Sequence, residues 1–249
     1  MARGKIVCFY GGKGGVGKTT TLLSLAGTLS KLNKKVLIVD LDLTNGAIAI
    51  SLNREANKTI FNFVEDYINN KYNDLDKYIT KYDENISFVA CPKDPRYASR
   101  IDVKYIDILL EKSVYNYDVV LIDTPSILNE ISVYSLDKSD IVYLLTTNDC
   151  VSLKNIKNLV NLFIENNLDK YKIILNNSFI PNKYYFSNYD IKNIIGHNVD
   201  YVISSSFHVN NLDELVVNGE LITYKYSKFK DEKIFNLIAS EIIGGNKDE

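Results

Sequence analysis

The sequence predicts an α/β fold in which one twisted, doubly wound and mostly parallel sheet carries helices on both faces. Short apolar runs, typical of strands buried on both faces, alternate along the chain with segments of helical apolar spacing. Carboxylates directly follow two of these runs, at residues 36–39 and 119–122. A glycine-rich stretch at residues 11–20 separates the first apolar run from the first helical segment. Strands alternating with helices in this way favour a parallel sheet with right-handed crossovers.

The elements are predicted in order from the apolar pattern. Continuous apolar runs predict strands at residues 6–10, 36–39, 86–91, 119–122, 141–146, 172–175 and 201–203. Apolar residues three to four positions apart, such as Leu22, Leu25 and Leu29, predict amphipathic helices. These helices are expected at residues 18–32, 59–69, 102–115, 152–165, 209–217 and 232–243. Residues 91–96 are predicted to be a loop.

Composition limits the class of protein. The 249 residues are 46% hydrophobic and 24% charged, enough for a sizeable core, and with no linker or repeat we predict one domain over residues 1–249. The formal net charge of −2 gives no general attraction to nucleic acid or anionic lipid. No apolar run is long enough to predict a membrane span, and the chain start does not resemble a secretory signal. Three widely spaced cysteines, Cys8, Cys91 and Cys150, predict reduced thiols in a cytoplasmic protein.

The glycine-rich stretch has the pattern of a phosphate-binding P-loop. It lies between a predicted strand and a predicted helix, so backbone N–H groups and the helix N-terminus can face one anion. Lys18 is predicted to reach the β- and γ-phosphates, and the Thr19 hydroxyl to hold Mg²⁺. The predicted nucleotide-binding residues of the loop are Gly12, Lys13, Gly14, Gly15, Val16, Gly17, Lys18, Thr19 and Thr20. The fold is therefore expected to be that of a P-loop NTPase.

Three carboxylates complete the predicted site. Asp40 and Asp42 follow one predicted strand and Asp123 follows another, and the carboxyl ends of parallel strands form the ligand-binding crevice of such sheets. Asp123 has the position of a Walker-B carboxylate, which holds Mg²⁺ largely through water. The alternative interpretation of a strand-end aspartate is a cap on the following loop, and for Asp42 it stays open.

The residues 13–19, KGGVGKT, together with Asp40, Asp42 and Asp123, resemble the deviant Walker A signature of the MinD/ParA family of ATPases. The resemblance covers nearly the whole chain. It implies an ATP- and Mg²⁺-dependent homodimer in which ATP is sandwiched, with Lys18 acting on its own nucleotide and Lys13 on the partner's. It further implies that Asp42 positions the attacking water, that Asp40 and Thr19 lie at the Mg²⁺, and that Asn176 contacts adenine.

Within the family, residues 39–49 and 149–155 look most like the CpaE/TadZ branch, which positions pilus machinery. The resemblance implies a protein partner from a pilus or secretion apparatus, or an ATPase activator, that recruits a cytoplasmic protein to a pole or to the inner face of the membrane. The chain departs from the family at Ile203-Ser204-Ser205-Ser206, near the expected adenine, and at Ile127 or Leu128, where a glycine is common. These departures leave open slower or absent ATP turnover.

Two other roles stay open. A ParA-type protein would bind DNA in its ATP form, and a MinD-like division regulator would bind membrane. The basic cluster Lys225, Lys228, Lys230 and Lys233 is interspersed with acidic residues, which favours a solvated face. The helix expected at residues 232–243 lacks the basic polar face of a membrane-binding helix, so we expect it to dock on the sheet.

Overall fold

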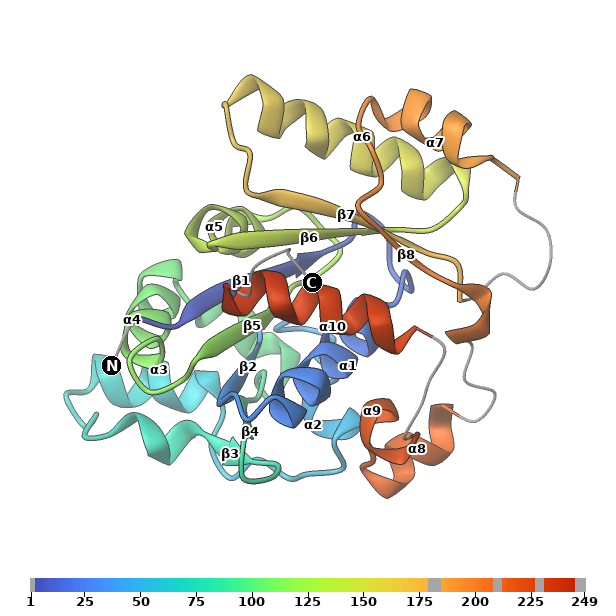
Figure 1. The fold of residues 1–249 in the computed structure, drawn as a ribbon. Helices are drawn as coiled ribbons and strands as arrows, with labels where there is room; N and C mark the ends of the chain where they lie inside the picture. Colours follow the sequence, from blue (N-terminus) through green and yellow to red (C-terminus); the bar gives the residue numbers. More distant parts are fainter. Residues whose placement is uncertain (1–2, 179–184, 208–211, 227–230, 245–249) are drawn as a thin grey trace.

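The computed structural model describes residues 3–178, 185–207, 212–226 and 231–244. Eight strands form one sheet in the order β3-β4-β2-β5-β1-β6-β7-β8 (Figure 1). Every pair of neighbours is parallel except β3 with β4. The strands are β1 (Lys5–Tyr10), β2 (Val36–Asp40), β3 (Thr80–Lys81), β4 (Ile86–Val89), β5 (Val119–Asp123), β6 (Ile141–Thr146), β7 (Tyr171–Asn176) and β8 (Tyr201–Ile203). The predicted doubly wound, mostly parallel fold is confirmed.

Helices cover both faces of this sheet (Figure 1). They are α1 (Lys18–Lys31), α2 (Ile48–Ser51), α3 (Ile60–Ile68), α4 (Val103–Ser113), α5 (Glu130–Lys138), α6 (Cys150–Glu165), α7 (Asn188–Ile195), α8 (Leu212–Asn218), α9 (Ile222–Lys225) and α10 (Glu232–Ile243). Short 3₁₀ turns lie at Leu75–Tyr78, Pro95–Arg100 and Ser205–Phe207. None of the described helices is long and apolar enough to cross a membrane.

Alternation along β1 shows how the two faces are divided. Ile6, Cys8 and Tyr10 pack into one buried cluster with apolar side chains of α3 to α7. Val7 and Phe9 pack into the other cluster, with side chains of α1, α2, α8, α9 and α10. Because successive side chains of a strand point to opposite faces, a strand buried on both sides is apolar throughout. This explains why the apolar runs of the sequence identify the strands.

The structure also differs from the sequence prediction. The antiparallel strand β3 and the helices α5 and α7 are absent from the prediction, because their apolar positions are few and are mixed with polar residues. The segment expected to be a loop is partly a 3₁₀ turn, at Pro95–Arg100. The helix expected at residues 209–217 is α8, whose first predicted residues lie outside the described part of the chain. The cysteines are free, with Cys8 buried, Cys91 half-buried and Cys150 exposed.

The C-terminal helix docks on the sheet as expected. Phe235, Ile238, Ala239 and Ile242 are buried in the same cluster as the apolar side chains of α1. Lys225 pairs with Glu214 and Glu220 at 3.5 and 3.0 Å, so this member of the predicted basic cluster is neutralised. Lys228 and Lys230 lie outside the described residues.

Candidate nucleotide site

The P-loop connects β1, the strand between β5 and β6, to α1 (Figure 1). Gly15 and Gly17 have φ angles of 77° and 92°, in the left-handed region that glycine adopts without strain. Gly17 is the residue before the first turn of α1, so the free N–H groups of that turn lie next to the loop. A Cβ added at Gly14 or Gly15 would meet no heavy atom within 4 Å. The loop therefore presents open backbone, as an anion-binding loop requires.

Lys18 lies at the base of the loop and is 9% exposed. Its ammonium donates a hydrogen bond to the Ser126 hydroxyl, in the segment after β5, at 2.8 Å. Burial lowers the pKa of Lys18, while the negative charges of Asp123 and Asp42 act in the opposite direction. The structure thus holds a cation beneath the loop, close to two of the three predicted carboxylates.

Asp40 and Asp123 end neighbouring strands at the same level of the sheet. Both side chains are at most 2% exposed. The Thr19 hydroxyl donates to Asp123 Oδ2 at 2.6 Å, and the Ile48 N–H donates to Asp40 Oδ2 at 3.2 Å. The two Oδ1 atoms have no hydrogen-bond partner among the described residues. Such buried oxygens are costly unless a cation or proton reaches them.

The pKa values of both carboxyl groups are shifted upward. Burial is the main cause for each, and it raises the pKa of Asp123 to about 6 although Thr19 and Lys18 favour its ionised form. The pKa of Asp40 is raised well above its ordinary value by burial and by the nearby charge of Asp123. Two orphaned carboxylate oxygens beside a threonine hydroxyl are a donor set that suits Mg²⁺, which takes oxygen ligands and keeps several waters. The residues present therefore fit the predicted Mg²⁺.

Asp42 lies two residues beyond the end of β2 and is partly exposed. Its Oδ1 accepts a hydrogen bond from the Asn45 N–H at 3.1 Å, which stabilises the turn leading to α2. Gly46 in this turn packs closely: a Cβ there would come within 2.6 Å of both Asp40 oxygens and of the Cys91 sulfur. The turn therefore covers Asp40 on one side. Asp42 makes the turn-capping contact that was one of its two predicted roles.

Lys13 lies on the exposed rim of the loop. Its ammonium is 3.2 Å from Asp149 Oδ2, and the two side chains are 44% and 32% exposed. Asp149 also accepts hydrogen bonds from the Thr147 hydroxyl and from the Ser152 N–H, which caps the start of α6. A cavity of about 290 Å³ lies beside these residues, bounded by the loop, the end of β6 and Tyr185. Lys13 is thus the loop lysine that another molecule can reach.

Asn176, at the end of β7, contacts the loop from a third strand. Its side-chain N–H₂ donates to the Val16 carbonyl at 2.9 Å, and its carbonyl oxygen accepts from the Ser178 N–H and hydroxyl. Asn176 is 2% exposed and fixes the loop on β7. Contact with adenine stays a prediction for this residue.

Sequence reasoning missed two residues that hold the loop. The Asn155 side chain on α6 donates to the Gly12 carbonyl at 2.6 Å, and a Cβ at Gly12 would be 2.7 Å from the Asn155 Cβ. The second residue is Ser126, whose hydroxyl accepts the hydrogen bond from the Lys18 ammonium. The residue types carry no signal for these contacts, because a serine or an asparagine after a strand or on a helix usually faces water.

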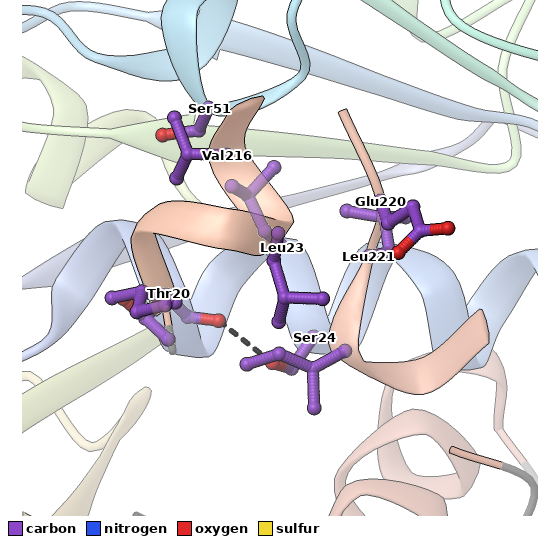
Figure 2. Close-up of a pocket in the computed structure, with 10 residues that line it drawn as sticks. Thr20, Leu23, Ser24, Ser51, Val216, Glu220 and Leu221 are labelled. Atoms are coloured by element: carbon purple, nitrogen blue, oxygen red, sulfur yellow. Dashed lines mark hydrogen bonds between the residues drawn. The ribbon is translucent and has the colours of Figure 1, made fainter. Parts of the chain in front are cut away.

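The outer side of α1 faces the C-terminal segment. A cavity of about 50 Å³ is lined by Thr20, Leu23 and Ser24 of α1, by Ser51 of α2 and by residues of α8 and α9. Figure 2 shows these side chains around the cavity, with the hydrogen bond from the Ser24 hydroxyl to the Thr20 carbonyl. Asn53, just after α2, donates to the Val217 carbonyl of α8 at 2.7 Å. The last predicted loop residue, Thr20, therefore borders a junction of α1, α2 and α8.

Fold and site together define a P-loop nucleotide-binding protein of the α/β class. The family model described as "AAA domain" matches residues 4–179, from the first strand past Asn176. The chain belongs to this family, and its relatives place it with the MinD/ParA ATPases. An uncharacterised ATP-binding protein of Methanocaldococcus jannaschii is 30% identical over 148 residues, covering 59% of this chain and 55% of that protein. The septum site-determining protein MinD of Helicobacter pylori is 28% identical over 158 residues, covering 63% and 58%.

Solved structures agree on the fold. The ParA family ATPase of Chlorobium tepidum superimposes with a TM-score of 0.83 at 19% identity, covering 95% of this chain and 98% of that one. MinD of Pyrococcus horikoshii, solved with Mg-ADP, gives 0.78 at 21% identity, covering 96% and 95%. In contrast, the alignments with the Methanocaldococcus jannaschii and Helicobacter pylori proteins span little more than half of the length of each.

Proposed function

We propose that residues 1–249 form a single ATPase domain that works as an ATP-dependent dimerisation switch. The observation that carries the proposal is the cluster beneath the open loop: the buried Lys18 ammonium and the unpartnered oxygens of Asp40 and Asp123. A cation and two anionic oxygens, brought together from separate elements, fit a magnesium-bound triphosphate. The Mg-ADP complex of the similar MinD supports this choice of ligand.

Each residue has a task that follows from its position. The loop backbone and Lys18 bind the phosphates, and the Lys18 charge offsets charge that develops on the transferred group. Thr19, Asp40 and Asp123 would hold Mg²⁺, which supplies positive charge against the phosphate oxygens. Asp42 orients the attacking water through its carboxylate, which also accepts the hydrogen bond from the Asn45 N–H that caps the turn. Asn176 fixes the loop, and we propose that it also contacts the adenine.

Lys13 supplies the reason for a dimer. Its side chain is 44% exposed and points to the rim of the loop, where a second copy of the chain can present a nucleotide. A cation delivered from the partner completes the charge stabilisation at the phosphates, so hydrolysis is slow in the monomer and depends on association. Hydrolysis by water then cleaves ATP to ADP and phosphate, the γ-phosphate no longer joins the two protomers, and the dimer separates.

The test uses Asp42→Ala, which removes the water-orienting carboxylate and keeps the phosphate and Mg²⁺ ligands. We expect light scattering with Mg-ATP to show a persistent dimer, while phosphate release falls to background. Wild-type protein should dimerise transiently and release phosphate. A chain that binds ATP and yet stays monomeric in both forms would refute the switch and leave an ATP-binding scaffold.

For the cellular task we propose positioning of a pilus or secretion apparatus, on the resemblance of residues 39–49 and 149–155 to the CpaE/TadZ branch. The protein would be cytoplasmic and recruited through a protein partner. Similar proteins favour two alternatives, since MinD of Helicobacter pylori is named a septum site-determining protein and a structural neighbour from Borrelia burgdorferi is named a putative plasmid partition protein. Sedimentation of the ATP form with anionic liposomes would indicate the first alternative, and salt-dependent sedimentation with DNA the second.

A further inference from the structure

The P-loop is packed against α6 at its start and open in its middle. A Cβ added at Gly12 would lie 2.7 Å from the Asn155 Cβ, so glycine is what lets the loop approach the helix this closely. A Cβ at Gly14 or Gly15 would meet no heavy atom within 4 Å. Lys13 lies between the packed and the open part. The contact with α6 therefore determines how the chain enters the open part at Lys13.

Asn155 also forms a hydrogen bond across this contact. Its side-chain N–H₂ donates to the Gly12 carbonyl at 2.6 Å, which is short for an N–H···O bond. The Gly12 carbonyl belongs to the same peptide group as the Lys13 N–H. This peptide bond is trans, so its C=O and its N–H point in opposite directions. A carbonyl held toward α6 therefore directs the Lys13 N–H away from α6.

The side away from α6 is the side of α1. Apolar side chains of α6 pack into the buried cluster on one face of the sheet, and those of α1 pack into the cluster on the other face. The Lys13 N–H therefore points to the side of the α1 N-terminus, where the free N–H groups of the first turn begin after Gly17. None of the described residues accepts a hydrogen bond from the Lys13 N–H. This donor is thus available to a ligand.

Several backbone N–H groups that face one point bind an anion. The first turn of α1 supplies such groups from one end of the loop, and the Lys13 N–H adds a donor from the other end. Without a partner for its carbonyl, the peptide after Gly12 could rotate, because glycine tolerates most backbone angles. Asn155 removes this freedom before a ligand arrives, which lowers the entropy cost of binding.

We infer that Asn155 is a positioning residue, which fixes the Gly12 carbonyl on α6 and thereby directs the Lys13 N–H at the phosphates of the nucleotide. The inference rests on the proposed function and adds to it. Lys13 serves its own nucleotide through the backbone N–H and the partner's nucleotide through the ammonium. α6 holds both groups, since Asp149, which caps this helix, lies 3.2 Å from the ammonium.

Calorimetric titration with Mg-ATP tests the affinity. The reference protein is Lys13→Met, which keeps the N–H of residue 13 and lacks the ammonium proposed to act in the dimer. Asn155→Leu in this background keeps a branched side chain against Gly12 and removes the donor. Mg-ATP should then bind about five- to twentyfold more weakly, because part of a hydrogen bond to a charged group is lost.

Asn158→Leu is the control for this titration. Asn158 is exposed on α6 three residues after Asn155, so its substitution should change the affinity by no more than about twofold. If Asn155→Leu binds Mg-ATP as tightly as the reference protein does, the inference is wrong.

A spectroscopic signal separates the orientation of the peptide from packing. Labelling glycine with ¹³C at the carbonyl and lysine with ¹⁵N selects three peptide groups of the chain, Gly4–Lys5, Gly12–Lys13 and Gly17–Lys18. The second is assigned because Lys13→Met removes its signal. In the wild type, saturating Mg-ATP should move the N–H protons of Gly12–Lys13 and Gly17–Lys18 to lower field, as hydrogen bonds to charged oxygens do.

In Asn155→Leu, the shift of the Gly12–Lys13 proton should be much smaller. The Gly17–Lys18 proton should shift as in the wild type, and Gly4–Lys5, at the start of β1, should stay in place in both proteins. Equal shifts of the Gly12–Lys13 proton in both proteins would overturn the role of Asn155 alone. A wild type in which Mg-ATP moves neither loop signal would contradict the proposed nucleotide site, and the inference with it.

Discussion

Lys18 and Lys13 belong to the same loop, yet they differ in burial and in the groups that they contact. Lys18 is 9% exposed and is fixed by Ser126 above two buried carboxylates. The Lys13 side chain is 44% exposed and makes a half-exposed ion pair with Asp149. A buried cation serves ligands that enter its own protomer, whereas a cation at the rim can also serve a ligand held by another molecule. The comparison explains how one loop can carry a binding function and an association function.

The largest effect is expected at the buried lysine. Lys18→Met keeps the length and the apolar stem and removes the charge beneath the loop. We expect the affinity for Mg-ATP to fall at least about 100-fold, because a buried charge-assisted contact with phosphate is lost. Calorimetry measures the change. Affinity within threefold of the wild type would mean that Lys18 is not a nucleotide ligand.

The matched substitution at the rim, Lys13→Met, should separate the two functions. Binding of Mg-ATP to the monomer should stay within about threefold of the wild type, since the Lys13 side chain is proposed to act on the partner's phosphates. The ATP-dependent dimer should weaken at least about tenfold, as a charge-assisted contact is removed from the interface. Light scattering over a concentration series measures the dimer. If the variant dimerises normally, the role of Lys13 in the partner site is wrong.

A smaller effect is expected from releasing Lys13. Asp149→Asn removes the charge that pairs with Lys13, and asparagine caps a helix as well as aspartate does. The pair is half-exposed and worth at most about 1 kcal/mol, so the ATP-dependent dimer should form at about two- to fivefold lower concentration. Asp102→Asn is the control, because Asp102 caps α4 and pairs with Lys104 at 3.5 Å. Equal effects of both substitutions would assign the change to net charge alone.

A further effect of about the same size concerns the stability of the fold. Asp40→Asn replaces a buried carboxyl group that lies beside Asp123. We expect the metal-free protein to gain about 1 kcal/mol in free energy of unfolding at neutral pH, because burial raises the pKa of the Asp40 carboxyl group at a cost in stability that a neutral amide does not bear. Urea denaturation in EDTA measures this gain, and it should vanish or reverse with Mg-ATP. A loss of stability in EDTA would show that Asp40 is already compensated in the empty protein.

The sequence predicted the fold because the sheet is buried on both faces. Its strands are continuous apolar runs, and β6 and α10 end where the pattern ends. β3 spans two residues at the sheet edge, and α5 carries too few apolar positions for its periodicity to be visible. Within the site, the motif and the strand ends predicted where Lys18, Thr19, Asp40 and Asp123 lie in the fold, and their roles at a nucleotide stay predictions. Ser126 and Asn155 depend on how the segment after β5 and the helix α6 meet the loop, and no local pattern encodes such contacts.

The unpartnered oxygens of Asp40 and Asp123 have a consequence for the lifetime of the protein. Burial of the two carboxyl groups costs free energy, and the proposed magnesium nucleotide would remove that cost and add its own binding free energy to stability. Protein molecules without nucleotide would therefore unfold more often, and proteases cleave the unfolded state. We expect the loaded copies to resist limited proteolysis far longer than the empty ones. In a cell, such a difference would clear inactive copies and tie the amount of protein to the supply of ATP.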